Sequence, residues 1–282
     1  MPVRRLAATL LSCGWALLIV GCGGTDAPPS VAVGAGPDAE SELLAQLYAA
    51  AIRYYGSPAH VERGDDPVTD LDSGDVQVVP GLTGRLLTRF DPEAVALGDE
   101  QVYRSMISSL PEGIAAGDYA MSASDEPAPA VAEATATRWD GRDVSALVKH
   151  CAGQRVGAVE GEVPPAEVGA CTLAEPREYP DPTSLFAALR SGRIDVAWTS
   201  SAASDVPDGV VVLADKTSLI RAENVVPLYR RNELSERQVL ALNQIAGELD
   251  TGSLADMLRK VGEGADSGAV AAEWLASHPL GR

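Results

Sequence analysis

Two stretches of the chain have the residue pattern of a small-ligand binding loop. Residues 71–87 read LDSGDVQVVPGLTGRLL, an apolar strand that ends at a Pro-Gly pair and passes into a helix near Thr83. The N-terminus of a helix presents backbone N–H groups with no partner inside the helix, so a ligand can bind there. Residues 189–201 read LRSGRIDVAWTSS and repeat the first stretch, with Trp198 at the position of Pro80. Two such loops predict two lobes that face each other across a cleft, although α/β chains also repeat such units by chance.

A third motif resembles a dinucleotide-binding loop. Residues 30–50, SVAVGAGPDAESELLAQLYAA, contain G-x-G-x-x-A between a strand and a helix, and Glu62 ends the next strand. That is the arrangement of the dinucleotide fingerprint. Pro37 has no N–H to offer a pyrophosphate, and the leader described below directs the chain out of the cytoplasm. We therefore expect no cofactor at this loop.

The sequence lacks the residue patterns that catalysis and metal binding usually need. It has no G-x-S-x-G elbow, H-E-x-x-H pair or Asp-rich calcium loop, and its three histidines have no obvious Ser or Cys partner. The net charge of −18 leaves no electrostatic footprint for nucleic acid or anionic lipid. We expect a protein that is not an enzyme, holds no metal ion and binds no nucleic acid.

The first 22 residues read as an export signal. Arg4 and Arg5 precede an apolar run that is too short to span a bilayer comfortably, and the run ends in Ile-Val-Gly-Cys at Cys22. This ending resembles a bacterial lipobox, so we expect a signal peptide at 1–21, lipidation of Cys22 and a flexible tether at 22–30. The domain would then be extracytoplasmic and anchored by lipid to the bacterial cell membrane. An ordinary signal peptide, or an uncleaved anchor with a chance cysteine, is the alternative.

Two cysteines remain beyond the leader, Cys151 and Cys171. A pair of cysteines in an exported protein is best explained as a disulfide. Closing a loop of this length stabilises a protein by about 3 kcal/mol in the chain-entropy model. We predict a Cys151–Cys171 disulfide.

Strands and helices alternate along the rest of the chain, which predicts an α/β protein with a largely parallel sheet in each lobe. We expect strands at 30–33, 59–62, 76–79, 155–159, 194–198, 210–214 and 225–230, and a strand that passes into a turn at 131–138. Helices are expected at 40–55, 92–110, 144–150, 182–190, 234–249, 254–261 and 269–277, the last three packing back onto the first lobe.

In their order and spacing these segments resemble the extracytoplasmic solute-binding proteins of ABC importers, specifically the osmoprotectant family that binds glycine betaine, choline or carnitine. The likeness covers about residues 31–280. It is carried by VGAGPDAESELLAQLYAAAI, SGDVQVVPGLTGRLL, LFAALRSGRIDVAWTSS and VVVLADKTSLIRAENVVPLYR. The second of these is similar to the family's strand followed by Pro-x-Tyr-Thr-Gly.

The resemblance implies the type II periplasmic-binding-protein fold, two α/β lobes with a ligand cleft between them. One lobe would hold residues 31–119 and 226–282 and the other 120–225, with crossings near 120–129 and 215–226. It also implies a monomer that captures a small solute and delivers it to an ABC permease and its ATPase. The alternative keeps the fold but makes the chain a lipoprotein sensor or scaffold that binds another envelope protein.

The chain departs from the family at the aromatic positions. Family members commonly hold a quaternary ammonium against tyrosine faces by cation–π attraction, but here Leu82 replaces the tyrosine and Pro127 stands where a ring is often found. Trp198 and Tyr119 are the candidate rings, and Trp198 is either a ligand contact or a residue packed at a sheet end. The ligand is therefore either a betaine held by Trp198 and carboxylates or a different polar or aromatic solute. The expected ligand-binding residues are Pro37, Asp38, Ser41, Leu82, Thr83, Asp125, Trp198, Thr199, Ser200 and Asn224.

Overall fold

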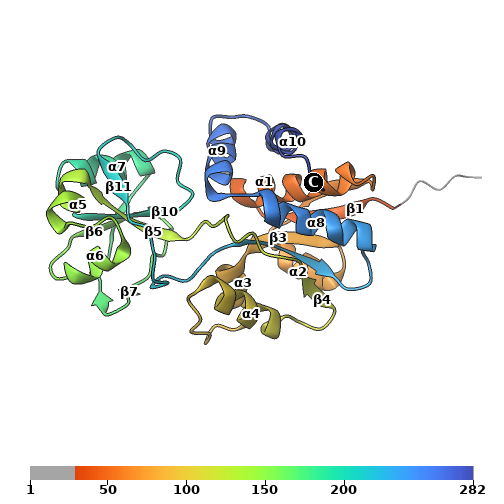
Figure 1. Ribbon diagram of the computed structural model, residues 1–282, viewed down its shortest axis with the longest axis horizontal. Coiled ribbons are helices and arrows are strands. Elements are labelled where there is room, and N and C mark those ends of the chain that lie inside the picture. The colour runs from red at the N-terminus through yellow and green to blue at the C-terminus, as the bar shows by residue number, and fades with distance from the viewer. Residues whose placement is uncertain (1–28, 282) are drawn as a thin grey trace, which may run out of the picture.

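The computed structural model describes residues 29–281, which form two lobes side by side (Figure 1). Each lobe contains a five-stranded sheet, and the strands follow the orders β2-β1-β3-β12-β4 and β9-β6-β10-β5-β11. The predicted signal peptide, Cys22 and most of the tether lie outside the described residues. Among the helices of residues 29–281, none is both long and apolar enough to cross a membrane.

The first sheet is mixed. Its strands are β2 (Ala59–Arg63), β1 (Val31–Ala35), β3 (Val78–Leu82), β12 (Val225–Arg230) and β4 (Ile114–Ala116). The strand β1 runs parallel to β2 and β3, whereas β12 runs antiparallel to β3 and β4. The expectation of a largely parallel sheet is therefore wrong. Because Val225 pairs with Leu82 at the end of β3, β12 starts where β3 ends and must run the other way.

The second sheet repeats this plan. Its strands are β9 (Arg177–Tyr179), β6 (Val156–Val159), β10 (Val196–Ser200), β5 (Pro127–Ala132) and β11 (Val210–Val212). The strand β10 is parallel to β6 and antiparallel to β5, just as β3 is parallel to β1 and antiparallel to β12. The two stretches that look alike in the sequence thus hold equivalent places in the two sheets.

The core of the first lobe is built around the helix α1 (Ala39–Tyr54), which is buried along most of its length. It begins at Asp38, whose side chain caps it, and lies between the sheet and α8 (Glu236–Glu248), α9 (Thr251–Gly262) and α10 (Ser267–Ser277) (Figure 1). A helix that is apolar on most sides needs partners on most sides. The expectation that the C-terminal helices pack back onto the first lobe is confirmed.

The opposite face of this sheet carries α2 (Pro67–Ser73), α3 (Thr83–Phe90) and α4 (Asp99–Ser109). The predicted helix at 92–110 is shorter than expected, since α4 begins only at Asp99. In the segment before it, the carbonyl oxygen of Ala96 accepts a hydrogen bond of 3.1 Å from the Arg221 guanidinium. In a longer helix this carbonyl would accept a hydrogen bond from an N–H of the same helix; here it accepts one from a side chain 125 positions later in the sequence.

The second lobe has α7 (Pro182–Arg190) on one face and α5 (Glu133–Trp139) and α6 (Val144–Lys149) on the other. The expectation of a strand and turn over residues 131–138 is wrong, since β5 ends at Ala132 and the following residues form α5. The disulfide between Cys151 and Cys171 is present, as predicted. It ties the end of α6 to a small hairpin made of β7 (Glu167–Val168) and β8 (Cys171–Thr172).

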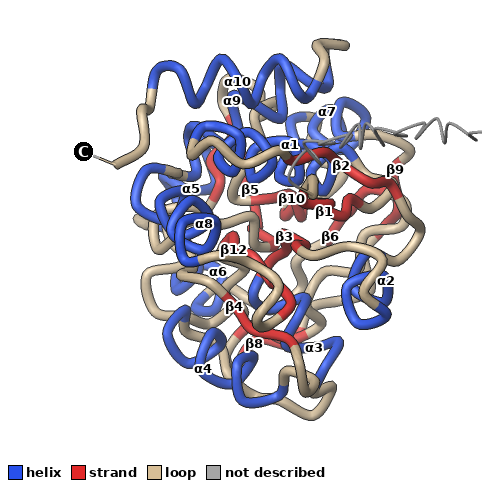
Figure 2. The backbone as a smooth tube through the Cα atoms, turned by 90° about the vertical axis from the view of Figure 1, so that its right-hand side faces the viewer, coloured by secondary structure: helices blue, strands red, loops and turns tan. Residues whose placement is uncertain are grey.

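Two chain crossings join the lobes, and we call residues 117–126 the first crossing and 213–224 the second. They pair with each other like a short antiparallel ribbon: the N–H of Asp125 donates to the carbonyl of Glu223 at 3.0 Å, and Ser124 bridges Asn224. In the view along the line that joins the lobes, β5 and β10 project close to β1 and β3 (Figure 2). The paired crossings set how one lobe stands against the other.

Candidate ligand-binding cleft

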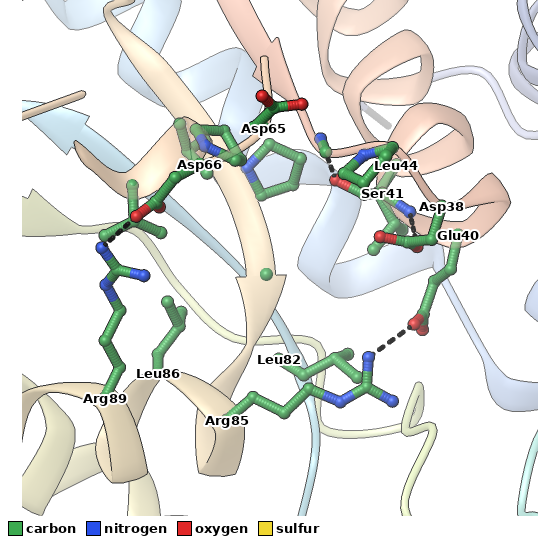
Figure 3. Close-up of a pocket in the computed structure, with 17 residues that line it drawn as sticks. Asp38, Glu40, Ser41, Leu44, Asp65, Asp66, Leu82, Arg85, Leu86 and Arg89 are labelled. Carbon is green, nitrogen blue, oxygen red and sulfur yellow. Dashed lines mark hydrogen bonds and ion pairs between the residues drawn. The ribbon is translucent and has the colours of Figure 1, made fainter. Parts of the chain in front are cut away.

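Each lobe has a cavity at the carboxyl ends of its parallel strands, where α/β sheets usually bind ligands. The lobe 1 cavity, about 520 Å³, lies between the β1–α1 loop, the β2–α2 loop, β3 and α3 (Figure 3). It is lined by Gly36, Pro37, Asp38, Glu40, Ser41, Leu44, Asp65, Asp66, Pro67, Val68, Val79, Pro80, Gly81, Leu82, Arg85, Leu86 and Arg89. The smaller lobe 2 cavity, about 250 Å³, is lined by Val159, Glu162, Pro182, Leu185, Trp198, Thr199, Ser200, Ala203 and Asp205.

The β1–α1 loop forms one wall of the lobe 1 cavity. The carboxylate of Asp38 accepts a hydrogen bond of 2.8 Å from the N–H of Ser41, and the hydroxyl of Ser41 accepts one of 2.7 Å from the N–H of Gly36. These bonds cap α1 and fix the loop, while the side chains of Pro37 and Asp38 remain exposed at the rim. The three sequence-predicted residues of this loop therefore lie together at the cavity.

Thr83 and Asn224 lie at the junction of α3 with the second crossing. The N–H of Thr83 donates to the carbonyl of Asn224 at 2.9 Å, and the N–H of Asn224 donates to the Thr83 hydroxyl at 3.0 Å. The Asn224 side chain donates to the carbonyl of Ala120 in the first crossing at 3.0 Å. Both residues are buried and lock the crossings to the first lobe, and neither lines the lobe 1 cavity.

The N-terminus of α3 is already occupied by the protein's own carboxylate. The N–H of Arg85 donates to Glu223 at 2.8 Å, so the expectation of unpaired N–H groups at this helix end is wrong at that position. Burial raises the pKa of Glu223 to about 7, although the N–H and the charge of Arg85 act to lower it. A carboxylate at a helix N-terminus is stabilised by the helix dipole.

Asp125 lies in the hinge and is bonded to a residue of the lobe 2 cavity. It belongs to the first crossing, and its buried carboxylate accepts hydrogen bonds from the hydroxyl of Ser200 and from the N–H of Ala202. Ser200 ends β10 and lines the lobe 2 cavity. One acidic side chain of the hinge is thereby held against the ligand-side end of the second sheet.

Glu40, in the first turn of α1, faces Asp125 from the first lobe. Its side chain is only 13% exposed and forms an ion pair of 3.1 Å with Arg85, while its Oε1 atom is buried without a hydrogen-bond partner. Burial, followed by the negative charge of Asp125, raises the pKa of Glu40 to about 8, against the lowering effect of Arg85. The raised pKa favours the protonated form of Glu40 at neutral pH.

The lobe 1 cavity is acidic and has no aromatic residue. Its lining includes only two arginines, Arg85 and Arg89, and Arg89 forms an ion pair of 2.8 Å with Asp66. The lining carboxylates are those of Asp38, Glu40, Asp65 and Asp66. In the lobe 2 cavity the only ring is Trp198, which is 4% exposed and packs in the core of its lobe. Within residues 29–281, no group of three or more His, Cys, Asp or Glu side chains is placed to hold a metal ion.

Residues 29–277 match the family model described as the substrate binding domain of ABC-type glycine betaine transport systems. The chain belongs to this family. It is a solute-binding protein of an ABC importer, as the resemblance in its sequence implied. A comparison with curated proteins finds no match to the chain.

Solved structures show the same fold. A glycine betaine/carnitine/choline ABC transporter protein superposes with a TM-score of 0.73 at 18% identity, covering 88% of this chain and 98% of that one. Apo YehZ from Escherichia coli superposes with a TM-score of 0.70 at 19% identity, covering 89% of this chain and 99% of that one. Lactococcal OpuAC, in its closed conformation with glycine betaine, superposes with a TM-score of 0.54 at 12% identity, covering 88% of this chain and 96% of that one. The expected two-lobed periplasmic-binding fold is confirmed.

The structure sorts the residues expected from the sequence into three places. Pro37, Asp38, Ser41 and Leu82 line the lobe 1 cavity, and Trp198, Thr199 and Ser200 line the lobe 2 cavity. The other three, Thr83, Asp125 and Asn224, belong to the hinge, and Tyr119 packs against Tyr103 at 4.5 Å between ring centres.

Sequence reasoning missed Glu40 and Arg85. Their positions held a signal, since Glu40 follows a helix cap beside a glycine-rich loop and Arg85 follows the Thr-Gly pair. Both residues lie in the first turn of a helix that starts at the cavity.

Gly84 tests the hinge contact. A Cβ at this position would lie 2.7 Å from the carbonyl oxygen of Ala222 and 2.7 Å from Glu223 Oε1, so Gly84→Ala must displace the second crossing. We expect urea denaturation to show a loss of about 1–3 kcal/mol in the free energy of unfolding. The control is Gly247→Ala in α8, where nothing lies within 4 Å of the added methyl, and it should gain up to about 1 kcal/mol. Equal stability of the two variants would contradict the contact.

Three buried or partly buried carboxyls make the stability of the protein depend on pH. The pKa is raised to about 8 for Glu40 and to about 7 for Glu126 and Glu223, in each case first by burial, so the folded protein binds these protons more tightly than the unfolded chain. Their stabilisation is complete below about pH 4.5 and is lost as the pH rises through 7 and 8. The free energy of unfolding should therefore fall between pH 6 and 8.5, by at most about 1.4 kcal/mol per pH unit for each carboxyl.

The contribution of Glu40 can be isolated. Glu40→Gln should flatten the fall between pH 7 and 8.5, whereas Glu112→Gln, in an exposed turn away from the cavities, should keep it. Denaturant titrations at each pH measure the effect. A Glu40→Gln profile that is indistinguishable from that of the unmodified protein would refute the assignment.

Proposed function

We propose that the chain is a lipid-anchored receptor that closes its lobes on a small solute carrying an ammonium group and delivers it to an ABC permease. One observation supports this most directly: the carboxylates of Glu40 and Asp125 meet where the lobe 1 cavity, the hinge and the end of β10 come together. A cationic group placed there would contact both lobes. Lactococcal OpuAC is closed on glycine betaine, and a choline binding protein with the same fold is in complex with choline; an ammonium group is the chemistry these two ligands share.

Lobe closure needs only binding energy. A solute that contacts both lobes in the closed state, and only one in the open state, shifts the equilibrium toward closure by the difference between its two affinities. The paired crossings give this motion a defined axis, because the hydrogen bonds of Thr83 and Asn224 keep them attached to the first lobe. No bond in the solute is made or broken, so we propose that the chain is a receptor and not an enzyme.

A screen of solutes tests the proposal. We expect a cationic or zwitterionic ammonium compound to raise the melting temperature of the purified protein, since a ligand present at 100 times its dissociation constant adds about 2.7 kcal/mol of stability. Neutral compounds of the same size, such as sugars and polyols, serve as controls. The proposal fails if only neutral or anionic solutes raise the melting temperature, or if a protein partner is captured and no solute binds.

The lipid anchor is tested separately. The chain with Cys22→Ser, expressed in a bacterium, should leave the membrane fraction, because the serine hydroxyl cannot replace the thiol that is lipidated. Cys13→Ser, inside the leader, is the matched control and should stay with the membrane. Membrane retention of Cys22→Ser would indicate an uncleaved anchor, and release of the unmodified protein an ordinary signal peptide.

A further inference from the structure

The carboxyl pair of Glu40 and Asp125 is more than a source of negative charge. Oε1 of Glu40 is buried, and no donor of the chain reaches it apart from a proton that it can share with Asp125, so a ligand that donates to it can take the place of that proton. The neighbouring positive charge is Arg85, which engages Glu40 through one nitrogen at 3.1 Å and leaves its own side chain 61% exposed. With both carboxyls ionised, these three side chains together carry a net charge of about −1, which matches one ammonium group.

Two kinds of ammonium group would meet this site differently. A quaternary ammonium has no N–H and is best held by the negative faces of aromatic rings. The lobe 1 cavity has no ring, and Trp198 in the lobe 2 cavity is packed in its core. A primary or secondary ammonium has N–H groups, and it forms charge-assisted hydrogen bonds with carboxylates that are about twice as strong as neutral ones.

We propose that the solute binds through a primary or secondary ammonium group whose N–H groups donate to Glu40 and Asp125. This inference rests on the proposed function and narrows its ligand to compounds that keep at least two hydrogens on the charged nitrogen. The class includes amino acids, amino alcohols and polyamines, and it excludes fully methylated betaines and choline as preferred ligands.

Binding of such a ligand should release a proton. The groups that face the Glu40 carboxyl are Asp125 from the first crossing, Arg85 from α3 and Asp38 from its own loop, and Ser200 from β10 holds Asp125 in place. The raised pKa of Glu40, about 8, means that the empty pair holds one proton at pH 7. An ammonium group between the carboxyls favours their ionised forms and takes the place of that proton. Affinity should therefore rise with pH, by up to about tenfold per unit between pH 6 and 8.

The test is a pair of methylation series measured by titration calorimetry on the purified protein. One series runs from ethanolamine to choline through its N-methylated intermediates, and the other from glycine through sarcosine and dimethylglycine to glycine betaine. We expect the dissociation constant to increase at least tenfold from the unmethylated to the quaternary member in the series that binds. Repeating the titration at pH 7 in buffers of different ionisation enthalpy should show close to one proton released per ligand.

Glu40→Gln separates this inference from a general effect of charge. This substitution should abolish proton release and raise the dissociation constant of the unmethylated ligand at least tenfold, while the dissociation constant of the quaternary member changes little. The control, Glu112→Gln, should behave like the unmodified protein. A circular dichroism spectrum and a melting curve confirm that Glu40→Gln is folded. If folding fails, the proton count and the pH dependence of the unmodified protein still decide the question.

Three outcomes overturn the inference. The first is a quaternary member that binds as tightly as the unmethylated one. The second is ligand binding without proton release at pH 7. In the third, neither series binds while a tertiary or quaternary ammonium compound of the screen does, which leaves the proposed function standing. Failure of every solute in the screen removes both the inference and the proposed function.

Discussion

Hydrogen bonds of the backbone and side chains of Thr83 and Asn224 hold the two crossings together and attach them to the first lobe, and the site depends on this attachment. Thr83 ends up fully buried, with its N–H and hydroxyl both bonded to the second crossing. Asp125 pairs with Glu223 next to it, so the first crossing follows the second. These bonds fix the position of one cavity relative to the other, and they hold Asp125 close to both Glu40 and Ser200.

The acidic groups at the hinge divide into two kinds. Glu223 is satisfied by the N-terminus of α3 and closes that helix end to any incoming anion. Glu40 keeps one buried oxygen that no donor of the chain reaches apart from a proton shared with Asp125. A protein that only needed a stable hinge would gain from pairing or removing such a group, since an unsatisfied buried polar atom is costly. At a binding site this loss of stability is offset when a ligand completes the hydrogen bonding of the buried oxygen.

Much of the fold followed from local patterns. The apolar alternation indicated β3 and β10 and their equivalence, although β3 runs through Pro80 and Gly81 to Leu82 and does not end before them. The pair of cysteines in a chain with an export signal predicted the disulfide. What sequence reasoning could not supply depends on residues far apart in the chain. Arg221 binds the carbonyl of Ala96 in the segment that precedes α4, and Glu223 accepts from the N-terminus of α3, although each lies more than a hundred positions away from its partner. For Trp198, the choice between a contact and a core residue depended on burial, which a strand pattern alone does not give.

The central place of β12 bears on how the chain folds during export. The strand lies between β3 and β4, and β4 has no other partner in the sheet. The first lobe therefore cannot complete its sheet until residue 230 has emerged, even though its other strands are among the first to be made. The strands of the second lobe, by contrast, all fall between residues 127 and 212, together with both cysteines of the disulfide. A chain that emerges from its N-terminus should thus complete the second lobe first, while the earlier strands wait for their missing neighbour.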